Sequence, residues 1–245
     1  MHTEAVFSRR RFLHISGAGI LGMEFLRSGG KIFLTPEIRA AEVTSPMSSE
    51  EALKELMAGN KRFVQSINDS CVQRTPDRRM EVAEGQHPFA VILACADSRV
   101  FPEIIFDQWI GDLSVVRVAG NIVSPANYGI LGSIEYGVKA LGVHLIMVLG
   151  HSRCGAVEGA IKAFKAGTTY PGSIEDIIKA IPPAVEKAQG APGDLLQNAI
   201  LENVRLGVSK LHNLDPVIAP MVKEGKGNVV GGHYDLVSGE VTLVV

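Results

Sequence analysis

The chain has 245 residues, of which 46% are hydrophobic and 20% charged, and its formal net charge is −2 at pH 7. This is enough for one globular domain with a substantial core, and a charge near zero, without a long basic run, gives no reason to expect a nucleic-acid partner. Three cysteines are too few for a disulfide framework, and two of them are considered below as metal ligands.

Residues 1–41 do not have the pattern of a folded domain. Ser8-Arg9-Arg10-Arg11-Phe12-Leu13 resembles a twin-arginine export signal, and a moderately apolar stretch runs from Ile15 to Leu26. Small residues at Ile38-Arg39-Ala40-Ala41 offer a place for a signal peptidase to cut. We therefore expect an export signal over 1–41, followed by a mature domain over 42–245.

Two residues weaken this interpretation, because Glu24 interrupts the apolar stretch and Arg27 ends it. The alternative is a disordered basic N-terminus, in which case the protein stays in the cytoplasm. The stretch is too short for a membrane span of about 20 residues. The export interpretation predicts a periplasmic or otherwise extracytoplasmic protein that does not stay inserted in a membrane after processing.

The domain is expected to begin with an amphipathic helix. Ser48 or Ser49 can cap it, Glu50 and Glu51 suit its positive end, and apolar residues at helical spacing continue to Val64. These signals predict an N-terminal helical arm.

Apolar runs then alternate with helical patterns along the rest of the chain. This alternation predicts an α/β fold, in which a mainly parallel central sheet is flanked by helices, with the N-terminal helical arm at one end of the chain and a C-terminal hairpin at the other. The expected strands cover 88–94, 113–119, 143–149 and 228–231, and a hairpin joins 234–237 to 240–245 around Ser238-Gly239. The expected helices cover 128–141, 155–165, 173–189 with a break at Pro182-Pro183, and 194–213 with Asp194 as its cap.

Two reactive stretches follow two of these strands. Cys95 comes directly after the first apolar run, and His151 and Cys154 come directly after the third. In open α/β sheets, reactive groups gather just beyond the carboxyl ends of the strands. Two thiolates and one imidazole suit Zn²⁺ in a tetrahedral site with one position left open, which is the pattern of a catalytic zinc. The sequence therefore predicts zinc ligands at these three residues.

Asp97 and Arg99 follow Cys95 at a spacing that lets both side chains point the same way. Zinc lowers the pKa of a bound water, and a carboxylate that accepts the water's other hydrogen orients it. Arg99 would keep the Asp97 carboxylate ionised. The alternative is a plain surface ion pair, which contributes little.

Together, Cys-x-Asp-x-Arg and His-x-x-Cys resemble the β-class carbonic anhydrases, and the likeness runs from about Glu50 to the C-terminus. It includes Gly59-Asn60-Lys61-Arg62-Phe63, Val115-Val116-Arg117-Val118-Ala119-Gly120-Asn121, Gly132-Ser133-Ile134-Glu135-Tyr136 and Tyr234-Asp235-Leu236. The resemblance implies a zinc lyase that hydrates CO₂ reversibly to bicarbonate and a proton. It also implies a homodimer or a dimer of dimers.

The resemblance implies further site residues. Gln86 and Tyr136 match polar residues that line the substrate pocket from the neighbouring subunit. Gly120 and Asn121 follow the second strand, where they form either part of the pocket wall or only a turn. It also allows a resting state with Asp97 as fourth ligand in place of the water. Members that favour that state tend to carry Trp three residues before the first ligand cysteine; here that residue is Ile92, which favours the water-bound state.

Two other functions stay open at this point. One is hydrolysis of CS₂ or carbonyl sulfide on the same fold, and the other is a non-catalytic homologue that binds zinc or bicarbonate. A non-catalytic homologue would be expected to have lost a zinc ligand, Asp97 or Arg99, and this chain keeps all of them. The third thiol, Cys71, lies in a polar stretch and is expected to be unpaired.

Overall fold

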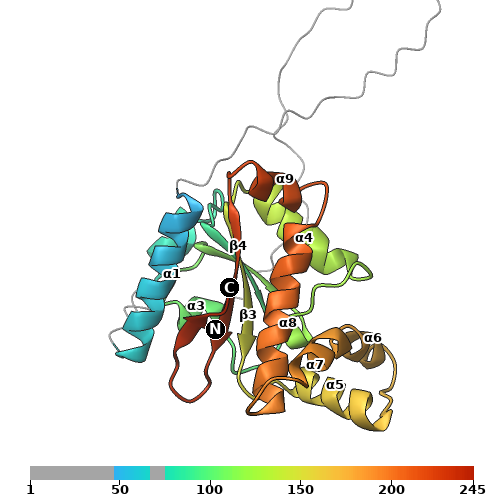
Figure 1. Ribbon diagram of the computed structural model, residues 1–245. Coiled ribbons are helices and arrows are strands. Elements are labelled where there is room, and N and C mark those ends of the chain that lie inside the picture. Colours follow the sequence, from blue (N-terminus) through green and yellow to red (C-terminus); the bar gives the residue numbers. More distant parts are fainter. Residues whose placement is uncertain (1–46, 67–74) are drawn as a thin grey trace, which may run out of the picture. The chain divides into compact units, whose positions relative to one another are not determined.

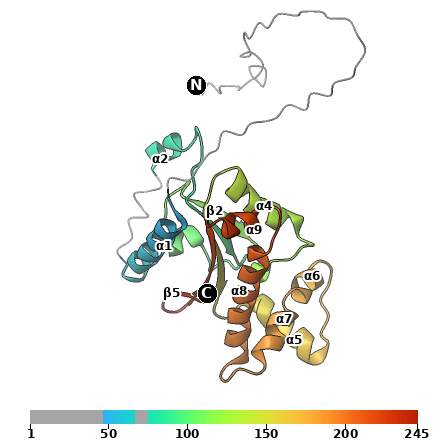
Figure 2. The same ribbon diagram turned by 45° about the horizontal axis from the view of Figure 1, so that its top comes forward.

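The computed structural model describes residues 47–66 and 75–245, so the predicted export signal over 1–41 and Cys71 lie outside the described residues. In the described part, no helix has both the length and the apolar character needed to cross a membrane. The helices shown in Figures 1 and 2 are α1 (Ser49–Val64), α2 (Pro76–Glu81), α3 (Pro102–Ile105), α4 (Tyr128–Lys139), α5 (Gly155–Ala166), α6 (Ile174–Lys179), α7 (Pro182–Ala188), α8 (Leu195–His212) and α9 (Ile218–Lys223). The strands are β1 (Ala90–Ala94), β2 (Leu113–Arg117), β3 (Leu145–His151), β4 (Asn228–Tyr234) and β5 (Val241–Leu243).

These strands form a five-stranded sheet in the order β2-β1-β3-β4-β5. All pairs are parallel except β4–β5. The last residue of β1, Ala94, pairs with Arg117 on one side and with Leu149 on the other. The predicted α/β fold with a mainly parallel sheet is confirmed, and its register places the ends of β1, β2 and β3 at one edge.

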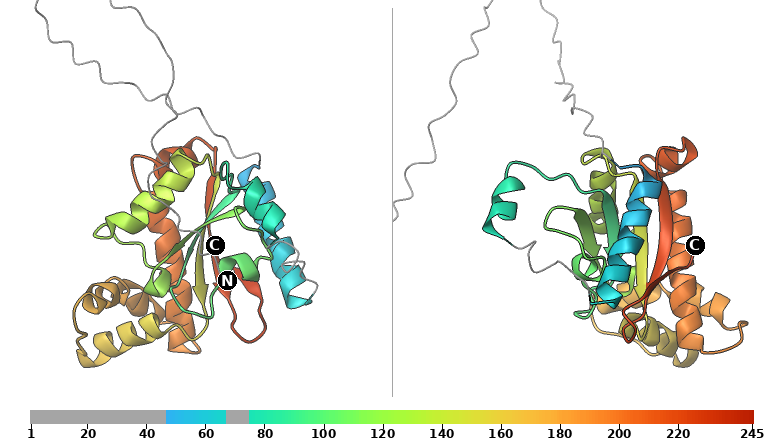
Figure 3. Two further views of the ribbon diagram at one scale, coloured as in Figure 1. Left: turned by 180° about the vertical axis from the view of Figure 1, so that it is seen from behind. Right: turned by 90° about the vertical axis from the view of Figure 1, so that its left-hand side faces the viewer.

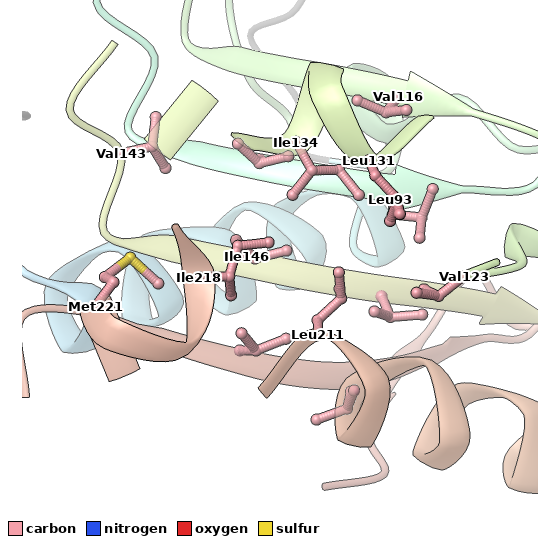
Figure 4. Close-up of a cluster of buried hydrophobic side chains, with 14 of the residues drawn as sticks. Leu93, Val116, Val123, Leu131, Ile134, Val143, Ile146, Leu211, Ile218 and Met221 are labelled. Carbon is pink, nitrogen blue, oxygen red and sulfur yellow. The ribbon is translucent and has the colours of Figure 1, made fainter. Parts of the chain in front are cut away.

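Helices cover both faces of the sheet, as the two views of Figure 3 show, with α1 on one face and α8 on the other. Alternate residues of β1 supply the two cores, because successive strand side chains point to opposite faces. Val91 and Leu93 belong to a cluster that includes buried residues of α4, α8 and α9 and is drawn in part in Figure 4. Ala90 and Ile92 belong to a second cluster, which includes residues of α1 and α3.

A third cluster lies beyond the edge of the sheet at which β1 and β3 end. It is built from α5, α7 and α8 together with Ile178 of α6, and it includes Cys95 and Cys154 among its buried members. The two cysteines are therefore buried among apolar side chains.

The capping residues expected at helix ends are confirmed. Ser48 caps α1 in a reciprocal capping box with Glu51, and the Asp194 side chain accepts a hydrogen bond from the backbone N–H of Gln197 at the start of α8. The predicted break at Pro182-Pro183 separates α6 from α7. The short helices α2, α3 and α9 were not predicted, because they are too short to show a periodic pattern.

The C-terminal region differs from the prediction. The sequence suggested a strand over 228–231 and a separate hairpin strand over 234–237, but β4 is one strand from Asn228 to Tyr234, and β5 pairs with it. Gly231 and Gly232 do not end the strand. A Cβ at Gly231 would lie 2.6 Å from Cγ1 of Val204 on α8, so glycine here allows α8 to pack closely on the sheet.

Candidate metal centre

Cys95, His151 and Cys154 meet at the edge of the sheet where β1 and β3 end. All three are buried, and their ligand atoms lie within 4.8 Å of one another. Cys95 follows β1, His151 is the last residue of β3, and Cys154 is the N-cap of α5. The parallel register of β1 and β3 explains why the two cysteines meet although they lie 59 positions apart in the sequence.

The imidazole of His151 is oriented for a ligand. Its Nδ1 lies 2.9 Å from the carbonyl oxygen of Ser152. Because a carbonyl oxygen only accepts, the hydrogen of the neutral imidazole is on Nδ1, which donates it to Ser152. This leaves a lone pair on Nε2, which is buried and has no hydrogen-bond partner. A buried nitrogen without a partner is costly, and a metal ion held jointly with the two thiols would satisfy it. The residues present therefore fit a metal ion.

The two thiols influence each other strongly because their sulfurs lie 4.0 Å apart. The pKa of Cys95 is lowered, first by the hydrogen bond from the Cys154 thiol and further by His151 and by the backbone N–H groups of Gly120 and Asp97. The pKa of Cys154 is raised, because its proton is shared with Cys95 and because it is buried. The pair thus gives up one proton easily and holds the other, and a cation would displace the second.

Asp97 and Arg99 form a tight pair beside this cluster. The Arg99 guanidinium donates to both carboxylate oxygens, over 2.9 Å to Oδ1 and 2.7 Å to Oδ2, and the Arg99 backbone N–H also donates to Oδ1. Asp97 Oδ2 is 3.9 Å from Nε2 of His151. Hydrogen bonds from the Arg99 side chain, opposed by burial, hold the pKa of Asp97 well below its usual range. Asp97 thus lies beside the Cys95–His151–Cys154 cluster with its side chain 17% exposed, whereas the side chain of Arg99 is 53% exposed.

Arg117 holds the loop that carries Cys95 and Asp97. From the end of β2 it donates to the carbonyl of Cys95 over 3.1 Å and to the carbonyl of Asp97 over 2.7 Å. Its guanidinium carbon also lies 5.0 Å from the centre of the Phe101 ring. Sequence reasoning missed this role, since a strand arginine gives no local sign of bonding a loop 20 residues earlier.

Comparison with known proteins agrees with this geometry. The sequence profile of the family described as "Carbonic anhydrase" matches residues 90–241. The solved β-carbonic anhydrase CcaA is 28% identical with a TM-score of 0.61, over 78% of this chain and 94% of that chain. The chain belongs to the β-class carbonic anhydrase family.

Individual relatives support the same family. Carbonic anhydrase 2 of Mycobacterium tuberculosis is 40% identical over 200 residues, covering 82% of this chain and 93% of the relative. The carbonic anhydrase of Mycolicibacterium smegmatis is 37% identical over 202 residues, covering 82% and 94%. Two tetrameric β-carbonic anhydrases from Sordaria macrospora share the fold, with a TM-score of 0.63 and 24% identity over 79% of this chain and 96% of that chain.

The other predicted site residues of this chain fall into two groups. Gly120 lies at the cluster, where its N–H donates to the sulfur of Cys95 over 3.2 Å. Gln86 and Tyr136 instead line a separate hollow of about 810 Å³ along β2 and α4. Arg117 also lines this hollow, so one residue both borders the hollow and bonds the loop that carries Cys95 and Asp97.

Proposed function

We propose that this chain is a zinc enzyme that hydrates CO₂ reversibly to bicarbonate and a proton. The observation that carries the proposal is the buried Cys95–His151–Cys154 cluster, beside which both oxygens of an ionised Asp97 accept hydrogen bonds from Arg99. Membership of the β-class carbonic anhydrase family supports the same reaction.

Zinc is the metal that best fits these ligands. Two thiolates and an imidazole are soft or borderline ligands, which exclude Mg²⁺ and Ca²⁺ and suit tetrahedral Zn²⁺. Three protein ligands leave a fourth position open, as catalytic zinc sites require. When bound, Zn²⁺ lowers the pKa of a water so that it can act as a nucleophile near neutral pH.

Asp97 is proposed to orient the reacting water. Its carboxylate accepts the hydrogen that does not leave, so that a lone pair faces the carbon of CO₂. Arg99 keeps Asp97 ionised and fixes its rotamer. Because both Asp97 oxygens are already bonded to Arg99, this arrangement favours the water-bound resting state over Asp97 as fourth ligand.

A direct experiment tests the proposal and its rivals. The purified protein is analysed for zinc and assayed for hydration of CO₂ and for hydrolysis of CS₂ and carbonyl sulfide. About one zinc per chain with rapid CO₂ hydration is expected. Hydrolysis of a sulfur substrate with negligible CO₂ hydration would favour the alternative hydrolase, and zinc without any turnover would favour the binding-only homologue.

The proposed functional unit is a homo-oligomer in which the partner subunit completes each site. β2 lies at the end of the sheet, and the hollow beside it exposes Tyr128 and Tyr136, which are 82% and 57% accessible. Aromatic side chains exposed beside an edge strand are typical of an interface. We expect a second copy to cover this surface and to receive Gln86 and Tyr136 at its substrate pocket.

Complementation between two inactive variants tests this sharing. Cys154→Ser should lack the metal, and Gln86→Leu should keep the metal but lose substrate positioning. When the two variants are unfolded, mixed and refolded together, activity should return, because each heterodimer contains one complete site. With random pairing, about one site in four of the whole mixture should be active. If Gln86 acts within its own subunit, the mixture stays as inactive as its components, and two-fold association should still be visible by ultracentrifugation.

Export by the twin-arginine route is proposed on the sequence of residues 1–41. Replacing Arg9 and Arg10 by Lys should leave the precursor in the cytoplasm, because the route reads the arginine pair as an address. Cell fractionation with immunodetection measures where the protein is. A second variant, in which Arg11 is replaced as well, tests whether this third arginine takes the place of the replaced pair. Shortened protein that still appears outside the inner membrane in both variants would contradict the proposal.

A further inference from the structure

The turn Ala119–Asn121 after β2 has a conformation that only certain residues adopt. Gly120 has φ 71° and Asn121 has φ 42°, both in the left-handed region. A Cβ at Gly120 would lie 3.0 Å from Cδ1 of Ile181 and 3.1 Å from Cβ of Ala156. The turn directs the Gly120 N–H at the sulfur of Cys95, over 3.2 Å.

The carbonyl of Gly120 is held by a side chain of α8. Nδ2 of Asn203, in the middle of this helix, donates to the Gly120 carbonyl over 2.8 Å. Asn203 is 7% exposed and lies next to the buried Val204. A buried amide at such a position is costly unless it is hydrogen-bonded, so this bond is a specific feature of the packing between α8 and the turn.

We propose that Asn203 is a positioning residue for the metal centre, acting through Gly120 on the sulfur of Cys95. Glycine rotates freely about its own dihedral angles, so anchoring its carbonyl restricts the direction of its N–H. Asn121 does not replace this anchor, because its own Nδ2 is buried without a partner. An N–H bond to a thiolate withdraws electron density from the sulfur and so tunes the metal that the sulfur binds. This inference rests on the proposed metal-binding function.

Cobalt substitution of the full chain reports on this contact without using activity. Co²⁺ bound by thiolates gives a sulfur-to-metal charge-transfer band whose energy depends on the electron density of the sulfur. In Asn203→Leu, a freer Gly120 N–H should move this band to longer wavelength and weaken Co²⁺ binding by about 10-fold or more. The matched control is Asn198→Leu, which removes an Asn from the same helix that donates to the carbonyl of Pro192; its band and Co²⁺ affinity should equal those of wild type.

The outcomes separate this inference from the proposed function. A wild-type protein that shows no thiolate–cobalt band would overturn the metal site itself. A folded Asn203→Leu protein with the wild-type band and affinity would overturn only the role of Asn203. If Asn203→Leu does not fold, Asn203→Ala, which keeps helix propensity, is judged by the same criteria. In ¹¹³Cd-loaded wild type, coupling between the metal and the Gly120 amide proton is expected, and its absence would also overturn the inference.

Discussion

Asp97→Asn is expected to keep zinc and to lower kcat/KM for CO₂ hydration by roughly 100-fold, about 2.7 kcal/mol of transition-state stabilisation. The reason is geometric. Asp97 lies beside the Cys95–His151–Cys154 cluster, and Arg99 fixes both of its oxygens. An amide of the same size can donate a hydrogen bond to the reacting oxygen where the carboxylate only accepts one, so the water turns away from CO₂. Stopped-flow hydration with zinc content measured on the same sample is the test.

The matched control is Glu202→Gln, which also removes a carboxylate paired with an arginine, at 2.7 Å from Arg205 on the surface of α8. It should retain wild-type activity. Equal turnover by zinc-loaded Asp97→Asn and by wild type would remove the orienting role.

The pH dependence gives a second check on Asp97. Hydrogen bonds from Arg99 lower the pKa of Asp97. The carboxylate is therefore ionised at any pH above the ordinary Asp pKa of about 4, and it stays ionised somewhat below that pH. Its contribution to stability is accordingly present above that pH and is lost only as pH falls through the lowered pKa. Asp97 should therefore not titrate at neutral pH, and the residual CO₂ hydration by Asp97→Asn should follow the same pH profile around neutral pH as wild type. A pH dependence that wild type shows in this range and that disappears in the variant would make Asp97 a titrating base instead.

Cys95→Ser and Cys154→Ser are each expected to lose nearly all bound zinc and with it CO₂ hydration. A serine hydroxyl is a harder ligand and is rarely deprotonated, so it replaces a thiolate poorly. The loss of zinc affinity should exceed the roughly 10–100-fold that is typical when a residue bonded to a ligand, rather than the ligand itself, is replaced. It would also leave the Nε2 of His151 buried without a ligand. Zinc content by mass spectrometry, combined with competition by a chelator, measures the effect.

Cys71→Ser is the matched control, because Cys71 is the remaining cysteine of the chain and the cluster is formed by the other two with His151. It should keep about one zinc per chain and full activity. If either ligand variant purifies with the same zinc content as Cys71→Ser, the ligand assignment is wrong.

Sequence alone determined the features that depend on neighbouring residues. Apolar runs and capping residues such as Ser48 and Asp194 act within a few positions, so they located the main helices and the parallel strands. Cys95, His151 and Cys154 could be grouped from the sequence as well, because each follows or ends an apolar run and the carboxyl ends of parallel strands meet at one edge.

The tertiary structure decided the hydrogen bonds that join distant segments around the site. The hydrogen bond from Asn203 to Gly120 spans 83 positions, and the bond from Arg117 to Asp97 spans 20. Neither has a local pattern, since a buried amide or a strand arginine acquires its partner only when the helices pack on the sheet. The strand end predicted at Gly231 was wrong for the same reason: its lack of a side chain serves the approach of α8, a contact that no neighbouring residue in the sequence reveals.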